Sequence, residues 1–245
     1  QLLTSGYEQV DLRYLKKKNI KISNALDVFS IQIAEDVLSK ILAFNRQLKG
    51  QFKHMEQGIW KHIPITHELY QKTVGVIGTG SIGLEVAKRL KGFECQVLGY
   101  RRKKQKTPFF DDILTEQQGF NEIIRKSDYI IIAIPLTKDT YHLLNEETLK
   151  MCKKDAVIVN VARGDIIDQN ALIKAIKEKH IRGALLDVTT PEPLPKDHEL
   201  WTLKEVIITP HNASASPQMA NRLLSLVSEN VLNYAKQKNV KFLIQ

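Results

Sequence analysis

From residue 73 onward the chain alternates short apolar runs with amphipathic helical stretches, and this alternation restricts its fold more than any other feature. The runs are TVGVI (73–77), CQVLGY (95–100), DYIIIAI (128–134), AVIVNVA (156–162), GALLDV (183–188) and VIITP (206–210). Near-continuous apolar strands separated by helices indicate a parallel sheet that is covered on both faces. We therefore predict an α/β fold built on a doubly wound parallel sheet, the Rossmann architecture.

Helical patterns lie between and around these runs. The predicted helices are 81–91, near 120–126, near 145–151, 168–179, and two longer ones at 31–48 and 217–237. Residues 1–30 hold two strand-like stretches, QLLTS and IKISN, and a short helix, QVDLRYLKKK. These first elements make about one βα unit, which is too small to bury a core of its own.

Composition excludes several classes of protein. A hydrophobic content of 43% with 26% charged residues is that of a globular chain, not a disordered one. The sequence has no long apolar run and no signal-peptide pattern, so we expect no membrane association and a cytoplasmic location. Two cysteines are too few for a disulfide framework, and we predict no metal site. The net charge of +9 is spread among acidic residues, which argues against a nucleic-acid partner and suits an anionic small molecule.

A glycine-rich turn follows the first strand of the predicted sheet. Gly78, Gly80 and Gly83 match G-x-G-x-x-G, between a predicted strand and a predicted helix. In a dinucleotide site the first glycine permits the tight turn, the second lets the backbone approach a pyrophosphate, and the third allows close packing of helix on strand. We assign cofactor binding to these glycines and to Ser81 and Ile82 between them.

The end of the next strand indicates which dinucleotide is preferred. An acidic residue there usually binds the ribose hydroxyls of NAD, but this chain has Arg101 and Arg102. A guanidinium pairs with the 2′-phosphate of NADP, so we predict a preference for NADP, with NAD as the alternative. The structural alternative is a solvated run of surface charge.

Further motifs follow the later strands: IPLTKDT, VNVARGDIID, LLDVTTPEPLP and IITPHNAS. With SGYEQVDL, IAEDVL and VGVIGTGSIG, they make the chain resemble the D-isomer-specific 2-hydroxyacid dehydrogenase family along nearly all of its length. That family has two domains, so the resemblance implies that residues 1–45 are the remainder of a flavodoxin-like substrate domain. The dinucleotide-binding domain would be 46–215, and 216–245 a helix returning to the substrate domain.

The resemblance implies that Arg163, Glu192 and His211 are catalytic. Reduction of a 2-oxo acid needs a proton for the carbonyl oxygen, and a histidine, which titrates near neutrality, can supply it. A carboxylate beside it would favour the imidazolium and fix the ring tautomer. A guanidinium would orient the substrate carboxylate and polarise the carbonyl. All three residues follow predicted strands, where α/β sheets bind their ligands.

The resemblance also implies the remaining contacts. Ser5 and Gly6, together with Arg163, would bind the substrate. The other residues expected to contact cofactor are Pro135, Thr140, Val161, Ala162, Asp187 and Ser214. Asp187 has a structural alternative, since an acid at a strand end can cap a turn, and Asn160 is expected to brace the Arg163 loop.

The sequence therefore predicts an NAD(P)-dependent oxidoreductase of small 2-oxo acids such as glyoxylate or hydroxypyruvate. The resemblance also implies a homodimer, with Trp60 in the segment that members of the family use as a dimerisation arm. An alternative is a dinucleotide-sensing regulatory protein like the corepressors on this scaffold; a formate-type enzyme is disfavoured by Glu192, where such enzymes usually have glutamine. Since a substrate cleft needs both lobes, we expect the isolated chain to bind cofactor but to turn over weakly or not at all.

Overall fold

The computed structural model describes residues 1–7 and 9–244, which form two compact units. The larger unit comprises residues 34–213, and the smaller comprises residues 1–33 with those from 214 onward. Each unit is considered separately below. No helix in the described part of the chain combines the length and apolarity needed to cross a bilayer.

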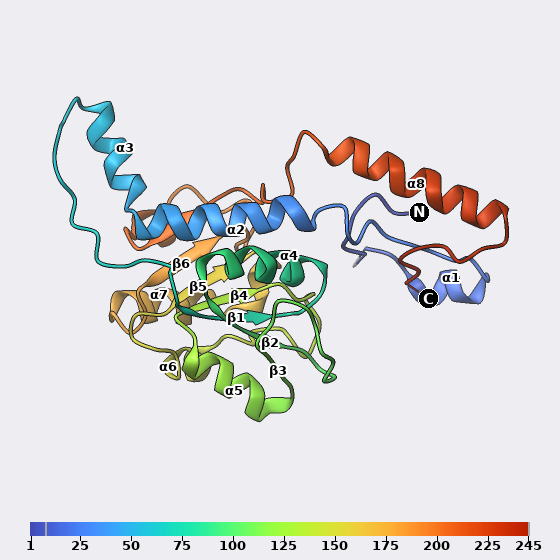
Figure 1. Ribbon diagram of the computed structural model, residues 1–245, viewed down its shortest axis with the longest axis horizontal. Helices are drawn as coiled ribbons and strands as arrows, with labels where there is room; N and C mark the ends of the chain where they lie inside the picture. The colour runs from blue at the N-terminus through green and yellow to red at the C-terminus, as the bar shows by residue number, and fades with distance from the viewer. Residues whose placement is uncertain (8, 245) are drawn as a thin grey trace. The chain divides into compact units, whose positions relative to one another are not determined.

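A seven-stranded sheet forms the centre of the larger unit (Figure 1). Its order is β3-β2-β1-β4-β5-β6-β7, and every neighbouring pair is parallel. The strands are β1 (Thr73–Ile77), β2 (Gln96–Tyr100), β3 (Asp112–Leu114), β4 (Tyr129–Ile132), β5 (Val157–Asn160), β6 (Gly183–Leu186) and β7 (Val206–Ile208). The chain moves outward from β1 to β3 and then returns to place β4 beside β1, so the order reverses between these two strands. This is the doubly wound topology that the sequence predicts.

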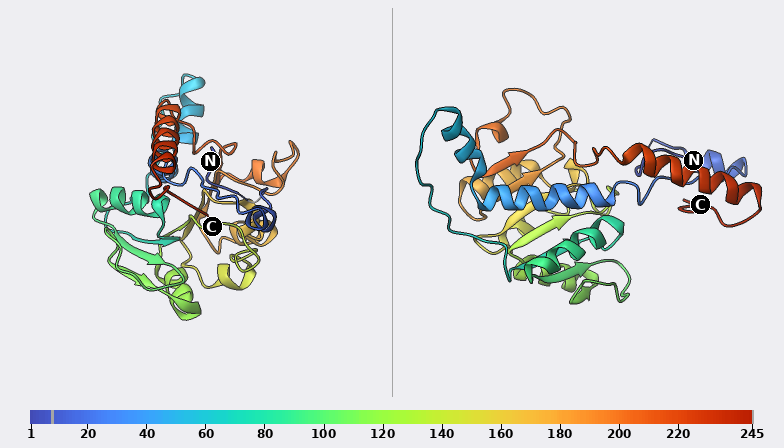
Figure 2. Two further views of the ribbon diagram at one scale, coloured as in Figure 1. Left: turned by 90° about the vertical axis from the view of Figure 1, so that its right-hand side faces the viewer. Right: turned by 45° about the horizontal axis from the view of Figure 1, so that its top comes forward.

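Helices cover both faces of this sheet (Figures 1 and 2). The helices of this unit, with α2 entering it from the smaller unit, are α2 (Ser30–Asn45), α3 (Leu48–Glu56), α4 (Ser81–Leu90), α5 (Glu116–Lys126), α6 (Glu146–Lys150) and α7 (Gln169–Lys177). Short 3₁₀ turns occur at Lys91–Phe93, Gly164–Ile166 and Glu199–Thr202. On one face, α5, α6 and α7 pack against alternate strand residues such as Ile130, Ile132 and Ile158. On the other face lie α4, beside Val76, and the C-terminal end of α2, where Phe44 approaches Gly183.

The smaller unit contains α1 (Leu12–Lys17) and α8 (Met219–Ala235). Ala25, Val28 and Leu226 form its small buried cluster. The first and last segments of the chain are joined by an antiparallel bridge between Ser23 and Leu243. Such a small apolar cluster provides little burial of its own.

The sheet and most of the helices confirm the predictions, with a few differences. The helix predicted at 31–48 ends at Asn45, where Gln47 has a left-handed backbone conformation (φ 53°), and α3 follows as a separate helix. The edge strand β3 was not predicted, because three residues are too few to give a pattern. The strands suggested by QLLTS and IKISN are wrong: within residues 1–7 and 9–33, the only strand pairing is the Ser23 bridge. The division at 45/46 and 215/216 stays a prediction.

Gly83 provides a test of the helix–sheet packing. A Cβ at Gly83 would lie 2.0 Å from the carbonyl oxygen of Gly78, so Gly83→Ala should force α4 away from β1 and lower the free energy of unfolding by about 1–3 kcal/mol. At Gly92 a Cβ would have no neighbour within 4 Å, so Gly92→Ala is the matched control and should be neutral or slightly stabilising. Urea denaturation measures both, and equal midpoints for the two variants would contradict the packing.

Candidate functional site

The predicted site residues of the larger unit gather at one edge of the sheet. Because all strands run in the same direction, their carboxyl ends lie along this edge, and ligands of α/β sheets bind there. The glycine turn follows β1, the arginines follow β2, and the Arg163 loop follows β5. Asp187 follows β6 directly, and His211 follows β7 by a few residues. The fold therefore brings together residues that are far apart in the sequence.

The glycine turn has the conformation that a pyrophosphate site requires. Gly78 has a positive φ of 104°, and a Cβ there would lie 2.3 Å from the carbonyl oxygen of Ala133. Gly80 is the N-cap of the ten-residue helix α4, provides no side-chain cap, and would have open space around a Cβ. The first N–H groups of a helix need acceptors, and phosphate oxygens supply them. The turn thus fits the phosphates of a dinucleotide, with Ser81 and Ile82 in the first turn of the helix.

The arginines at the end of β2 provide positive charge at the same edge. The Arg101 backbone N–H donates to the Leu114 carbonyl oxygen at 3.1 Å, which fixes the start of this loop beside β3. Arg101 is half-buried and Arg102 is exposed, and neither side chain has an ion pair or hydrogen bond with another described residue. Both guanidinium groups are therefore available to an anionic ligand.

His211 and Glu192 form a pair at this edge. The Nδ1 atom of His211 lies 2.9 Å from Oε2 of Glu192. The other carboxylate oxygen, Oε1, accepts the backbone N–H of Thr189 at 3.0 Å, so both oxygens of Glu192 have a partner. About half of the His211 side chain (49%) is exposed, which leaves the ring accessible to a small molecule. An imidazole held through Nδ1 by a carboxylate retains Nε2 for proton transfer.

Gln169 braces the loop that carries Glu192. Its amide nitrogen donates to the Thr190 carbonyl oxygen at 2.6 Å, and its amide oxygen accepts the Thr190 N–H at 3.1 Å. The backbone between β6 and Glu192 is therefore held from α7, on which Gln169 is the first residue. The sequence analysis did not single out Gln169.

The Arg163 loop packs directly against the loop of Glu192. A Cβ at Gly164 would lie 2.2 Å from the Thr189 carbonyl oxygen, so only glycine permits this approach. Asn160 is buried at the end of β5; its amide nitrogen donates to the Arg163 carbonyl oxygen at 2.9 Å, and its amide oxygen accepts the Ala162 N–H at 3.0 Å. Asn160 thus braces the loop, as expected. The structure therefore places Arg163 on the loop adjacent to the His211–Glu192 pair.

Asp187 is buried (3% exposed) and anchors the segment that carries His211. Its carboxylate accepts the Thr209 hydroxyl and the backbone N–H groups of Asn212 and Ala213, each of the latter at 3.0 Å. Burial raises the pKa of Asp187, but the bonds from Thr209, Ala213 and Asn212 and the charge of Lys40 outweigh it, so the pKa lies below its ordinary value. The structural alternative, a strand-end acid that caps a turn, is realised; cofactor contact stays a prediction.

The other predicted residues lie either in loops of the larger unit or in the smaller unit. Thr140 closes the loop after β4, because its hydroxyl donates to the Pro135 carbonyl oxygen at 2.8 Å and accepts the Thr137 N–H at 2.7 Å. Val161 and Ala162 are buried in the loop after β5. The remaining three residues belong to the smaller unit: Ser5, Gly6 and Ser214. Their carbonyl oxygens accept hydrogen bonds from Asn24, Thr4 and Gln32, respectively, and their ligand contacts stay predictions.

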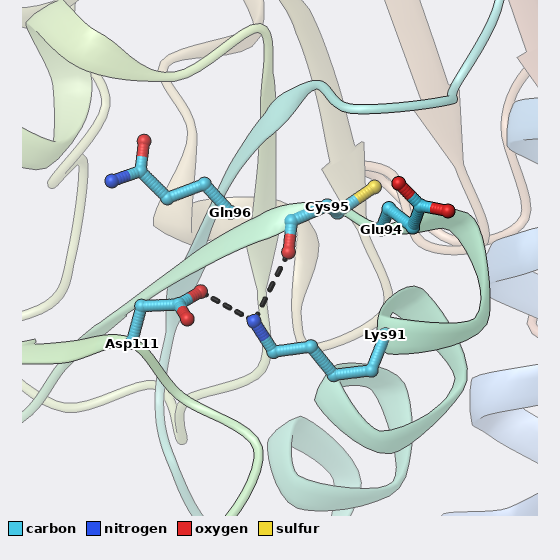
Figure 3. A pocket seen from close by; sticks show the side chains of 5 residues that line it. All are labelled: Lys91, Glu94, Cys95, Gln96 and Asp111. Atoms are coloured by element: carbon cyan, nitrogen blue, oxygen red, sulfur yellow. Dashed lines mark hydrogen bonds and ion pairs between the residues drawn. The ribbon is translucent and has the colours of Figure 1, made fainter.

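A depression at the amino end of β2 lies away from this edge (Figure 3). It is lined by Lys91, Glu94, Cys95, Gln96 and Asp111. The Lys91 ammonium donates to the Cys95 carbonyl oxygen at 3.1 Å and to the Asp111 carboxylate, and Glu94 and Gln96 bond to residues outside the depression, so its polar side chains are already paired. It is therefore a poor candidate for the functional site.

Comparison with known proteins identifies the family. Residues 38–213 match the model of the D-isomer specific 2-hydroxyacid dehydrogenase NAD binding domain. Glyoxylate reductase of Pyrococcus horikoshii is 36% identical over 239 residues, which cover 94% of this chain and 71% of the relative. That of Thermococcus gammatolerans is 37% identical over 237 residues, covering 94% and 70%. The chain belongs to the D-isomer-specific 2-hydroxyacid dehydrogenase family.

Solved structures agree with this family. An acyclic imino acid reductase in complex with NADPH and D-Arg superposes with a TM-score of 0.89 at 31% identity, over 99% of this chain and 77% of that one. D-lactate dehydrogenase with NAD⁺ from Lactobacillus jensenii gives 0.83 at 25% identity, over 100% and 77%. As a family member, this chain is an NAD(P)-dependent oxidoreductase that transfers a hydride between NAD(P)H and a 2-oxo acid or its D-2-hydroxy acid.

The pKa of Asp187 predicts how stability depends on pH. Because this pKa is depressed in the folded chain, Asp187 stabilises the fold above its unfolded pKa of about 3.9, and the contribution is lost as pH falls through the folded value. At neutral pH Asp187→Asn should lower the free energy of unfolding by about 1–3 kcal/mol, because Lys40 loses one of its two acidic partners and the donors of segment 209–213 lose a charged acceptor.

Urea denaturation from about pH 3 to pH 8 measures this difference, which should shrink below about pH 4. Asp139→Asn is the control, since Asp139 is exposed, and it should have little effect at any pH. A difference between the wild type and Asp187→Asn that stays constant over this pH range would exclude an ionised Asp187.

Proposed function

We propose that this dehydrogenase reduces small 2-oxo acids of the glyoxylate and hydroxypyruvate type, with NADPH as the preferred cofactor. The proposal rests on the His211–Glu192 pair, in which Nδ1 and Oε2 are 2.9 Å apart. This pair lies at the same edge of the sheet as the glycine turn. The relatives named glyoxylate reductase support the substrate class.

The proposed roles follow from the side chains. When bound, the reduced nicotinamide supplies a hydride to the carbonyl carbon. His211 donates a proton to the carbonyl oxygen as negative charge develops there, and Glu192 stabilises the imidazolium and orients its ring. Arg163 binds the substrate carboxylate and polarises the carbonyl. Ser5 and Gly6 are proposed to bind the carboxylate through backbone groups.

The dinucleotide would be held by the carboxyl-edge loops. The uncapped start of α4 at Gly80 is suited to its phosphates. Arg101 and Arg102 are suited to a 2′-phosphate, since their guanidinium groups have no acidic partner among the described residues. The structural neighbours include complexes with NADPH and with NAD⁺, so the preference for NADP rests on these arginines.

We also propose that the protein is a homodimer, and a cytoplasmic location stays a prediction. The segment that includes α3 exposes several large apolar side chains: Phe52, Met55, Ile59 and Trp60. Trp60 is fully exposed, and a run of exposed apolar residues marks an interaction surface.

His211→Gln tests the proposed general acid. The rate of NADPH oxidation with glyoxylate or hydroxypyruvate should fall by about 10²–10⁴, while the NADPH affinity measured by fluorescence titration should not change. The readout is the rate of the variant relative to that of the wild type, so it requires only a measurable wild-type rate. His62→Gln is the control, because His62 is exposed and outside the site. An equal rate in His211→Gln and wild type would leave only a nucleotide-binding function.

Arg101→Asp tests the cofactor preference. Replacing the guanidinium by a carboxylate should lower the ratio of NADPH to NADH affinity by about tenfold or more, since a charge-assisted bond contributes roughly 1.5–3 kcal/mol. Lys106→Asp makes the same change in charge farther along the loop and should leave the ratio nearly constant. If both variants alter the ratio equally, the effect is general electrostatics and the assignment is wrong.

Trp60→Glu tests the dimer. Light scattering should give the mass of two chains for the wild type and of one chain for the variant, because a buried charge opposes association. Trp201, which is 48% exposed, provides the control Trp201→Glu, which should remain dimeric. A monomeric wild type would refute the proposal.

A further inference from the structure

A lysine is buried on the apolar side of α2. Lys40 is only 4% exposed, on the helical stripe that also carries Val37, Ile41 and Phe44. Lysines are almost never fully buried unless they are paired, because a buried charge without a partner is costly. The ammonium of Lys40 has two acidic partners: Asp36, one turn earlier in the same helix, and Asp187, whose Oδ1 lies 3.4 Å away.

Asp187 connects the Lys40 ammonium to segment 209–213, which carries His211. The Asp187 carboxylate accepts the Thr209 hydroxyl and the N–H groups of Asn212 and Ala213, and its backbone carbonyl oxygen accepts the His211 N–H at 2.8 Å. His211 itself has a left-handed backbone conformation (φ 51°), which is uncommon for a residue with a side chain and must be stabilised by its surroundings. Asp187 therefore accepts hydrogen bonds from four residues of this segment: Thr209, His211, Asn212 and Ala213.

The hydrogen bonds that segment 209–213 donates to the Asp187 carboxylate depend on its ionisation. A charged carboxylate accepts hydrogen bonds with both oxygens, whereas a protonated one loses charge and becomes a donor at one of them. Burial at 3% exposure favours the protonated form of this carboxylate, and the hydrogen bonds from segment 209–213 together with a nearby positive charge oppose that effect. From α2, Lys40 and Asp36 face Asp187, and Lys40 provides the positive charge. The only titratable side chain of segment 209–213 is His211, which bonds to Glu192.

We propose that Lys40 is a positioning residue for the hydride-transfer reaction: it keeps Asp187 ionised, and ionised Asp187 holds segment 209–213 so that His211 meets Glu192. The catalytic consequence rests on the proposed role of His211 as proton donor. Lys40 itself does not touch the reacting atoms in this account; it acts through Asp187.

Lys40→Met tests the proposal, because it keeps the length of the side chain and removes its charge. The Asp187 carboxyl ¹³C signal, followed by NMR as a function of pH, should titrate at higher pH in Lys40→Met than in the wild type. Amide hydrogen exchange at Asn212 and Ala213 should also accelerate relative to the wild type as pH is lowered, by about tenfold for each unit by which the Asp187 titration moves. Exchange at Ile131, in the centre of β4, should not change.

Matched variants separate the charge of Lys40 from packing. Lys126→Met removes an ion pair with Glu122 of the same i,i+4 spacing on the exposed side of α5, and it should leave Asp187 and its partners unchanged. Lys40→Arg keeps the charge and should restore the wild-type titration. In an Asp187→Asn background, Lys40→Met should have no further effect on exchange at Asn212 and Ala213, as expected when one residue acts through the other.

Two results would overturn the inference. One is an Asp187 titration that is the same in Lys40→Met as in the wild type. The other is amide exchange that rises as much at Ile131 as at Asn212 and Ala213 in Lys40→Met. If Lys40→Met does not fold, the same measurements on Lys40→Gln, which is polar but uncharged, decide the matter, and a wild-type titration there contradicts the proposal. These readouts do not use activity. If the titration moves as expected but kcat for oxo acid reduction is unchanged on the acid side, the positioning role of Lys40 is wrong when His211→Gln still lowers the rate, and the role proposed for His211 fails when His211→Gln does not.

Discussion

The common direction of the seven strands is the constraint on which the rest of the structure depends. Parallel pairing places every carboxyl end at one edge, and the reversal of strand order between β1 and β4 separates the loops there. As a result the glycine turn, the arginines after β2 and the loops carrying Arg163 and Glu192 share an edge although over a hundred residues separate Gly78 from His211. The topology of the sheet therefore brings the candidate site residues to one edge.

Buried polar groups then set the detailed positions of these loops. Asn160 ties the Arg163 loop to β5, Gln169 ties the Glu192 loop to α7, and Asp187 ties the His211 segment to β6. Each of these side chains satisfies backbone groups of a loop that lies outside the regular strands and helices. A glycine at position 164 lets two of the loops touch. The geometry of the candidate site thus depends on buried residues that hold its loops as well as on the residues proposed to meet substrate.

Sequence patterns predicted the parts of this structure that depend on local repetition. Continuous Val and Ile runs predicted every strand but β3, and the glycine spacing predicted the turn whose Gly78 has a positive φ. The bonds of Asp187, Gln169 and Lys40 could not be predicted, because each joins segments that only the folded chain brings together. One signal was visible for Lys40: a lysine on the apolar stripe of a helix, with Asp36 four residues before it. Its partner Asp187 carries no such signal.

Cofactor and substrate are proposed to meet at the carboxyl edge, beside Arg163 and the His211–Glu192 pair. NMR mapping of the full chain with NADPH and a non-reacting oxo acid analogue tests this placement. We expect the amides of residues 80–83, 101–102 and 161–163 to shift with cofactor, and the His211 ring and Arg163 guanidinium to shift when the analogue is added. Shifts centred instead on the Lys91–Asp111 depression at the amino edge, with His211 unaffected, would show that the ligands bind elsewhere.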